Sequence, residues 1–280
     1  MKAPDFSYYE AKSIDEAIKF KSEDDESVFL AGGQSLIPAL NMRLSTPSCL
    51  IDISKLSELS VIKFENNSLY IGALATHSEV LNNDIVNEKI PVLKNILKMV
   101  AHPAIRNKGT HGGSIAYADP AAELPAFAVA MNAEIVLSGL KGKRTVAAND
   151  FYLGLFETDI MPDEMLIGIN YPCLKTNQYI VFDEVCRRHG DYAMAGLIAR
   201  VELENNNIKE LKLVFFATGD RPDIAHETAK IIINEGYDYL LTKKSLNSEL
   251  EFAGDLNSSP EMKLHLATIL INKALKKLEI

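Results

Sequence analysis

Short blocks of apolar residues separated by polar ones predict a small α/β unit at the start of the chain. Residues 13–16 have the Ser-x-x-Glu pattern of a capping box, which begins a helix. The apolar run 27–31 predicts a short buried strand, and 49–53 predicts a second one. Between them, 36–44 predicts a helix with Pro38 near its first turn. This strand–loop–helix–strand order resembles a small α/β unit.

The middle of the chain predicts further strands and helices. Residues 68–75 alternate as a strand does, and 76–79 form another capping box at a helix start. Pro91 begins a longer helix, which is expected to end near His102 because proline disfavours the helical conformation of the residue before it. The other predicted elements here are a buried segment over 124–130, a hairpin of 133–137 with 144–147, and a strand over 165–171.

The last third of the chain changes character, because long strands are followed by helices. Apolar runs predict strands over 179–187, 195–204 and 208–217, and helices over 224–234 and 260–278. This order indicates a separate α+β domain on a three-stranded antiparallel sheet. We therefore expect two domains with a boundary near 172–177: residues 1–173, with sub-parts of about 1–55 and 56–173, and residues 174–280.

Composition and charge narrow the class of protein. Among the 280 residues, 47% are hydrophobic and 24% are charged, which is ordinary for a globular protein. The formal net charge of -9 argues against a nucleic-acid partner, which would require a basic face. No apolar run approaches the roughly 18–20 residues that cross a bilayer, and the N-terminus lacks the apolar stretch of a signal peptide. We expect a cytoplasmic protein without a membrane span.

Cysteine and histidine spacing gives no sign of a metal site. The 3 cysteines, Cys49, Cys173 and Cys186, are isolated and form no C-x-x-C pair. This spacing excludes an iron–sulfur cluster held by four local thiolates and disfavours a disulfide framework. The 6 histidines form no H-x-x-x-H pair. No metal site is expected within this chain.

Two glycine-bearing loops are the best candidates for binding chemistry. Residues 31–35 (Ala-Gly-Gly-Gln-Ser) directly follow the first predicted strand, and residues 109–114 (Gly-Thr-His-Gly-Gly-Ser) lie roughly 80 residues later. Glycine allows close backbone approach, and successive N–H groups can cradle a diphosphate. Neither loop matches the Rossmann or the P-loop pattern, and each alone could be a tight turn. Together they predict a ligand gripped from two sides.

Four segments resemble the FAD-binding subunits of molybdenum hydroxylases, the family of xanthine, carbon monoxide and nicotinate dehydrogenases. Residues 31–38 resemble the A-G-G-[Q/H]-S-L-[I/L]-P loop of that family, and 102–114 resemble its P-x-I-R-N-x-G-T-x-G-G segment. Residues 118–125 continue the match, and 182–193 resemble its R-x-G-D-[F/Y]-A block. The segments stand in the family's order and span nearly the whole chain.

The resemblance implies an α+β fold with a two-part FAD-binding region of the PCMH/VAO type, followed by the family's C-terminal flavoprotein domain. It implies that residues 31–36 wrap the FAD diphosphate and that Thr110 and its neighbours close on it from the other side. The cofactor-binding residues implied are Ala31, Gly32, Gly33, Gln34, Ser35, Leu36, Thr110, Gly112, Gly113, Ser114, Asp119, Glu123, Leu166, Arg187 and Tyr192.

Within that set, Asp119 and Glu123 are expected near the ribityl and adenosine hydroxyls, Leu166 near the adenine, and Arg187 to Tyr192 near the isoalloxazine ring. These residues could instead have purely structural roles: Asp119 and Glu123 could cap the following helix, and Arg187 could be solvated.

The sequence also departs from the family pattern at several positions. His111 stands where the family usually has isoleucine or valine, and Ser114 replaces the commoner asparagine or aspartate. Asp183 and Glu184 stand where some relatives carry lysine, so a lysine contact with the flavin is not expected here.

In function, the resemblance implies an electron-transfer subunit that is not competent for hydroxylation by itself. Its partners would be a large molybdopterin-binding subunit and a small [2Fe–2S] subunit, whose electrons pass through FAD to NAD or another acceptor. The substrate of the assembly would be a purine, nicotinate or a similar compound, or an aldehyde. The alternatives are a stand-alone FAD-dependent reductase of the same fold and a non-catalytic binding module.

Overall fold

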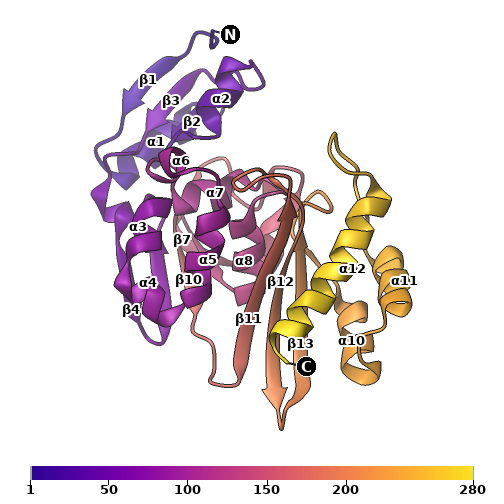
Figure 1. Ribbon diagram of the computed structural model, residues 1–280. Coiled ribbons are helices and arrows are strands. Elements are labelled where there is room, and N and C mark those ends of the chain that lie inside the picture. The colour runs from indigo at the N-terminus through magenta and orange to yellow at the C-terminus, as the bar shows by residue number, and fades with distance from the viewer. Residues whose placement is uncertain (1, 280) are drawn as a thin grey trace.

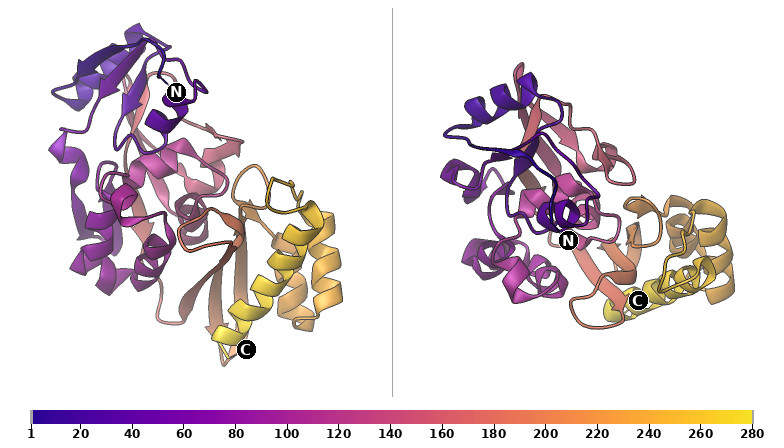
Figure 2. Two further views of the ribbon diagram at one scale, coloured as in Figure 1. Left: turned by 45° about the horizontal axis from the view of Figure 1, so that its top comes forward. Right: turned by 90° about the horizontal axis from the view of Figure 1, so that it is seen from above.

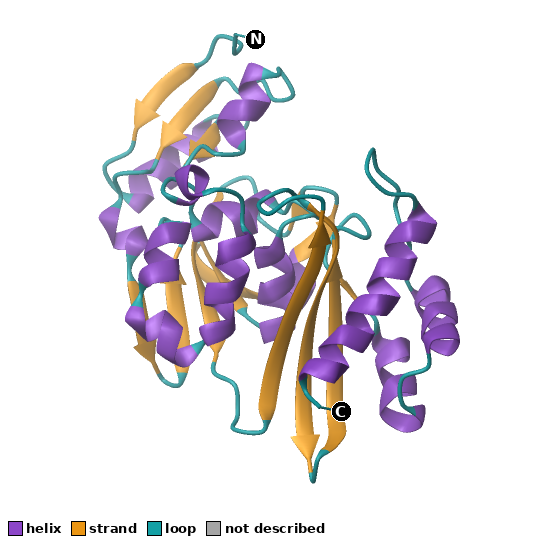
Figure 3. Ribbon diagram, in the orientation of Figure 1, coloured by secondary structure: helices purple, strands orange, loops and turns teal. Residues whose placement is uncertain are grey.

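The computed structural model describes residues 2–279, and the chain forms three successive sheets flanked by helices (Figure 1). A three-stranded sheet at the N-terminal end is followed by a five-stranded sheet and then by a four-stranded sheet, and a two-stranded hairpin stands apart from them. Figure 3 shows helices against each of the three larger sheets. Among residues 2–279, no helix combines the length and the apolar character needed to cross a bilayer.

The N-terminal sheet is parallel, with the strand order β1-β3-β2. Ser13 caps α1 by accepting a hydrogen bond from the N–H of Glu16, as the capping-box pattern predicts. One side of this lobe packs its apolar residues against Met165 and Ile167 of the next sheet. The elements are β1 (Ser7–Glu10), α1 (Ile14–Glu23), β2 (Val28–Leu30), α2 (Leu36–Asn41), β3 (Cys49–Asp52) and the 3-10 helix η1 (Ser57–Ser60).

The five-stranded sheet is antiparallel, with the order β4-β5-β10-β6-β7. Its central strand, β10, comes last in the sequence, so the sheet closes only when residues 164–172 pair with both neighbours. The strands are β4 (Ile62–Glu65), β5 (Ser68–Gly72), β6 (Glu134–Gly139), β7 (Gly142–Ala147) and β10 (Glu164–Pro172), with the hairpin β8 (Tyr152–Gly154) and β9 (Glu157–Thr158) nearby.

Helices connect the strands of this second lobe, and one of them is buried on every side. The segment 123–131 is apolar all round apart from its first residue, which is typical of a core helix, and each of its residues is buried. The helices are α3 (His77–Asn82), α4 (Asp84–Lys89), α5 (Pro91–Met99), α6 (Pro103–Arg106), α7 (His111–Tyr117), α8 (Glu123–Met131) and α9 (Ala148–Phe151).

The C-terminal sheet is antiparallel, with the order β11-β12-β13-β14, and its two faces are covered by different parts of the chain. Leu197 and Phe215 pack with the C-terminal helices, whereas Ile198 and Phe216 belong to the core that contains α8. Figures 1 and 2 show this sheet between the second lobe and α12. The elements are β11 (Gln178–Cys186), β12 (Ala193–Glu204), β13 (Asn207–Phe216), β14 (Asp223–Ile224), α10 (His226–Glu235), α11 (Tyr239–Glu249) and α12 (Pro260–Lys277).

Most predicted elements are confirmed within a few residues, but the short elements β1, η1, β4, α4, α6, α9, β8 and β9 were not predicted. Further differences concern the second glycine loop and the C-terminal lobe. The second glycine loop is largely a helix, α7, because Thr110 caps its first turn. The prediction missed α11, which Asp238 begins by accepting from the N–H of Leu241. Residues 223–224 form a fourth strand, β14, so the helix predicted from 224 begins at His226. The C-terminal sheet therefore has four strands rather than three.

Candidate functional site

A cavity of about 620 Å³ lies where the two glycine segments meet. Its size falls in the usual range of ligand pockets, about 300–1,000 Å³. Its walls come from residues 28–36, from 100–123, from β10 and from the loop 190–192. With one exception, the predicted cofactor-binding residues line it: Ala31, Gly32, Gly33, Gln34, Ser35, Leu36, Thr110, Gly112, Gly113, Ser114, Asp119, Glu123, Leu166 and Tyr192.

The first glycine segment offers a row of free backbone donors. Among residues 2–279, the N–H groups of residues 32–36 donate to no protein acceptor, while the side chain of Gln34 donates to the carbonyl of Gly32 at 3.0 Å. Gly33 has a φ of +69°, a conformation that L side chains rarely adopt. A Cβ at Gly32 would lie 2.0 Å from the carbonyl oxygen of Lys108, so this glycine lets the two segments touch. The free N–H groups suit an anionic ligand.

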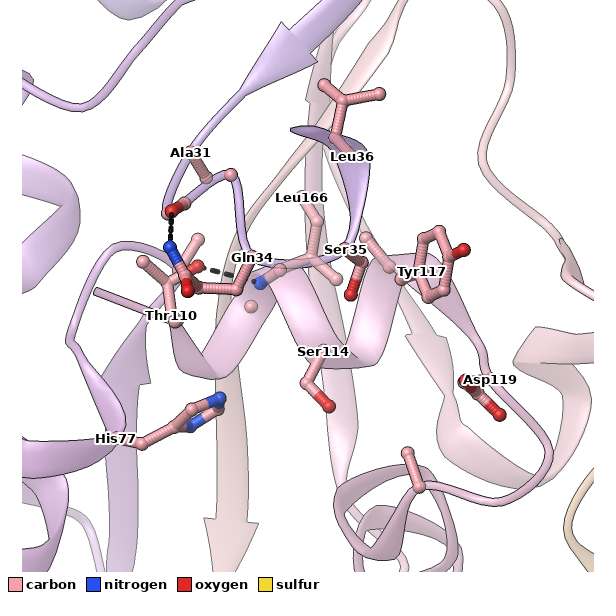
Figure 4. Close-up of a pocket in the computed structure, with 18 of the residues that line it drawn as sticks. Ala31, Gln34, Ser35, Leu36, His77, Thr110, Ser114, Tyr117, Asp119 and Leu166 are labelled. Carbon is pink, nitrogen blue, oxygen red and sulfur yellow. Dashed lines mark hydrogen bonds between the residues drawn. The ribbon is translucent and has the colours of Figure 1, made fainter. Parts of the chain in front are cut away.

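The second glycine segment offers few free N–H groups, contrary to prediction. The N–H of Gly112 donates to the carbonyl of Ala73 at 2.9 Å, and that of Gly113 donates to the Thr110 hydroxyl at 3.1 Å. The N–H of Ser114 donates to the Thr110 carbonyl at 3.1 Å. These bonds build the first turn of α7 and leave the Ser114 hydroxyl to face the cavity (Figure 4).

Three of the four carboxylic acids in the cavity wall, Asp119, Glu123 and Glu164, have contrasting surroundings. Asp119 accepts a hydrogen bond from the N–H of Ala121 at 2.9 Å, so it shapes its own turn. Glu164 receives the Arg144 guanidinium at 2.6 Å, and this bond lowers the pKa of Glu164. Glu123 is only 8% exposed, and burial raises its pKa to about 8. The carboxyl of Glu123 is therefore protonated at neutral pH.

His77 is a cavity residue that the sequence reasoning missed. It is the first residue of α3, directly after the N-cap Thr76, and it is 5% exposed. Burial lowers its pKa to about 4, so it is neutral at neutral pH, and its Nδ1 atom has no partner among residues 2–279. Figure 4 shows its ring on the cavity side of α3, below Thr110. The capping box at residues 76–79, which is visible in the sequence, places His77 at the first position of α3.

Arg187 is the exception among the predicted site residues, since it does not line the cavity. Its guanidinium donates to the side chain of Asn257 at 2.7 Å, on the side of the C-terminal lobe. Tyr192 does line the cavity, but it is 66% exposed and stands at the opening. Gly190, next to it, has a φ of +87° and packs against the His102 ring. The block 182–193 thus contributes its end, not its first arginine, to the site.

His111 lies behind the site rather than in it. Its ring is fully buried, and Nε2 shares a hydrogen bond with the hydroxyl of Tyr171 at 2.7 Å. Burial lowers the pKa of His111 to about 3, so the ring is neutral. Because α7 and β10 are joined by this pair, His111 replaces an apolar contact with a buried hydrogen bond and adds no charge next to the ligand.

The fold and this site define a two-part cofactor-binding module joined to an α+β lobe, and comparisons with known proteins identify it. Residues 4–174 match the family described as "FAD binding domain in molybdopterin dehydrogenase", and residues 180–278 match "CO dehydrogenase flavoprotein C-terminal domain". The chain therefore belongs to the FAD-binding medium subunits of the molybdopterin hydroxylase family, as the resemblance implied.

Known relatives match three quarters or more of the chain. The glyceraldehyde dehydrogenase medium chain of Sulfolobus acidocaldarius is 37% identical over 99% of both chains. The carbon monoxide dehydrogenase medium chain of Hydrogenophaga pseudoflava is 33% identical over 75% of this chain and 74% of its own. In the crystal structure of quinoline 2-oxidoreductase from Pseudomonas putida 86, one chain matches with a TM-score of 0.92 and 32% identity, covering 99% of this chain and 98% of its own.

Proposed function

We propose that the cavity holds FAD and that this chain passes electrons from the [2Fe–2S] clusters of a small partner subunit to NAD or another acceptor. The observation that carries the proposal is the row of free N–H groups at residues 32–36, which faces a cavity of about 620 Å³. FAD supplies the junction between single-electron transfer and hydride transfer. A large molybdopterin subunit would oxidise the substrate, a purine, nicotinate or similar compound, or an aldehyde.

The residues of the cavity would divide the work of binding. The N–H groups of residues 32–36 would bind the diphosphate, with the hydroxyls of Ser35 and Ser114 beside it. Asp119 and Glu123 would face the ribityl and adenosine hydroxyls, and Leu166 would pack against the adenine. Tyr192 would cover the opening, where electrons leave for the acceptor.

We also propose that the chain resides in the cytoplasm. Among residues 2–279, Cys49, Cys173 and Cys186 are free thiols, which suits the reducing cytoplasm.

The first experiment compares the absorption spectrum of the purified wild-type chain with that of the purified variant Ser35→Asp. Ser35 is exposed, lies among the free N–H groups and caps no helix with its side chain, so the fold should tolerate aspartate. The new carboxylate would repel the diphosphate and take its donors, and we expect FAD to bind at least about tenfold more weakly. Fluorescence titration of the FAD-free chain measures this change.

The matched control for this experiment is Ser13→Asp. Ser13 caps α1 far from the cavity, and aspartate caps equally well, so FAD affinity should not change. Equal FAD affinity in Ser35→Asp and in the wild type would contradict the diphosphate assignment. A colourless wild type would favour the non-catalytic binding module.

A stand-alone FAD-dependent reductase is the second candidate function, because a cavity that holds FAD is compatible with such a reductase as well as with an electron-transfer subunit. Copurification from the native cell distinguishes them. The proposed subunit should copurify with molybdenum, iron and two further chains, whereas a stand-alone reductase should oxidise NADH with a small acceptor at full rate when pure.

A further inference from the structure

Two buried carboxylic acids, Glu123 in the cavity wall and Glu184 on β11, form no ion pair within residues 2–279. Glu123 begins α8, lines the cavity and is 8% exposed, and among residues 2–279 its side chain bonds to no other residue. Glu184 lies on β11, and both of its carboxyl oxygens are buried without a hydrogen-bond partner in the described chain. Buried charges are normally paired, so these groups call for an explanation.

Strand geometry places Glu184 on the face of β11 that meets the core containing α8. Successive side chains of a strand point to opposite faces. Phe182 packs with the core that contains α8, whereas Val181 and Val185 pack with the C-terminal helices, so Glu184 shares the face of Phe182. Opposite Glu184 on β12 stands Gly196, and the Phe216 ring fills the space where a side chain of Gly196 would lie. Glu184 therefore stands against an aromatic ring rather than water.

Most ionisable groups around the pair are acidic or neutral, and the two cations nearby bond to other side chains. Asp183 on β11 bonds to Lys277 of α12 at 3.0 Å, and Arg187 bonds to Asn257, so the nearby cations are engaged elsewhere. The other groups near the pair are Asp119 before α8, Cys186 at the end of β11, and Asp191 and Tyr192 after it.

These surroundings raise the pKa of both groups of the pair. Burial raises the pKa of Glu123 to about 8, with the charge of Glu184 adding to it. Burial raises the pKa of Glu184 to about 7, with the charge of Asp183 adding to it. Glu164, in the same cavity wall, shows the opposite behaviour because Arg144 compensates it.

We propose that Glu123 and Glu184 form a proton-holding pair at the wall of the FAD cavity, which keeps a proton at neutral pH and presents a carboxyl O–H to the cofactor. A negative charge on Glu184 disfavours the ionisation of Glu123, so the two buried carboxyl groups titrate as a coupled unit. A protonated carboxyl donates a hydrogen bond to an acceptor atom of the cofactor, such as a hydroxyl oxygen, which a carboxylate cannot do. The inference rests on the proposal that FAD occupies this cavity.

The pair makes the charge of the cavity depend on pH, and charge near a flavin tunes its potential. As the pH rises through the titration of the pair, negative charge appears at the wall and disfavours the addition of electrons. The midpoint potential of bound FAD should therefore fall with a steeper segment near pH 7–8, the range of the two pKa values. Spectroelectrochemical titration of the FAD-loaded full chain between pH 5 and 9 measures this profile.

The variant Glu184→Gln tests the pair. A glutamine keeps the shape and offers N–H donors to Glu123, so Glu123 should ionise at lower pH and the steep segment should move below pH 7. The variant Glu184→Lys should move the steep segment to still lower pH, because a nearby cation favours the ionised form of Glu123. The matched control is Glu210→Gln on β13, because Glu210 is exposed in the same sheet and should leave the profile unchanged.

The wild type alone supplies a second readout, which does not depend on whether a variant folds. Infrared titration of the full chain labelled with 13C-glutamate should show a carboxylic-acid carbonyl band persisting above pH 6, where ordinary carboxyls are ionised. Absence of that band, or the same potential profile in Glu184→Gln and the wild type, would overturn the pair. A colourless wild-type chain would instead overturn the FAD site, so the two failures are distinguishable.

Discussion

Gly32 and Gly33 are neighbours in the first loop, yet each is required for a different reason. Gly33 has a φ of +69°, which supplies the turn after β2. Gly32 has no such conformation, but the carbonyl oxygen of Lys108 occupies the place of its Cβ. The first glycine therefore joins two lobes, and the second shapes the row of donors.

We expect Gly32→Ala to push the two segments apart. A Cβ would lie 2.0 Å from the Lys108 carbonyl, and relieving such overpacking costs about 1–3 kcal/mol. Both the free energy of unfolding and the FAD affinity should fall, as chemical denaturation and flavin titration would measure. Gly142→Ala is the control, because it has a φ of +106° but nothing within 4 Å. It should lower stability without weakening FAD, and equal effects of both variants would refute this account.

Sequence reasoning found both glycines because the Gly-Gly pair is visible in the chain. It could not find the contact of Gly32 with Lys108, since nothing local connects residues that far apart. Similarly, the isolated Glu184 carries no local sign that both of its oxygens are buried without partners. Residue types were predictable, whereas their partners depend on the assembled lobes.

At the scale of elements, α7 has a low intrinsic helix propensity and depends on contacts that compensate for it. The segment His-Gly-Gly-Ser-Ile-Ala-Tyr has two glycines, each costing about 1 kcal/mol relative to alanine in a helix. The Thr110 cap and the bond from Gly112 to Ala73 hold its first turn. For this reason a local pattern predicted a loop where the structure has a helix.

Thr110→Ala should release that turn. Loss of an N-cap costs about 1 kcal/mol, and the first turn of α7, which carries Ser114 toward the cavity, should fray. We expect a lower thermal midpoint together with weaker FAD binding. Ser259→Ala removes the cap of α12, whose side chain accepts from Met262, and should lower stability equally with FAD affinity unchanged. If both variants bind FAD as tightly as the wild type, α7 does not shape the site.

The opposite case is α11, where the prediction had no element at all. Its polar and apolar residues do not separate onto two faces of the helix, and its clearest sequence signal is the N-cap residue Asp238. The strands and α12 were predicted because their apolar periodicity is strong, and α8 because it is apolar throughout. Elements with a marked apolar pattern or a capping box at their start, such as α1 and α3, were predictable from sequence, whereas those held mainly by tertiary contacts were not.

At the scale of the whole molecule, α8 unites the two regions that match separate families. It is buried entirely, partly against β12 and β13 of the C-terminal sheet. Lys212 of β13 donates to the carbonyl of Val129 at 2.5 Å and to the side chain of Asn132 at 2.6 Å, which satisfies the C-terminal end of α8. The two regions that match separate families thus share the core around α8, and the C-terminal lobe has a second core on the other face of its sheet.

We expect the full chain to unfold in a single calorimetric transition for this reason. A chain that ends at residue 174 should show no cooperative transition, because it would expose the face of α8 that meets Ile198, Val214 and Phe216. Differential scanning calorimetry of both chains in the same buffer measures this. Two separate transitions in the full chain would show that the lobes fold independently.

The strand order of the central sheet also has a consequence for biosynthesis. The middle strand, β10, is made after its neighbours β5 and β6, and the cavity is lined from Val28 to Tyr192. A ribosome must therefore release more than the first 192 residues before the cavity is complete. The cofactor cannot template the early steps of folding, so its supply should govern how many finished chains are loaded rather than how many fold.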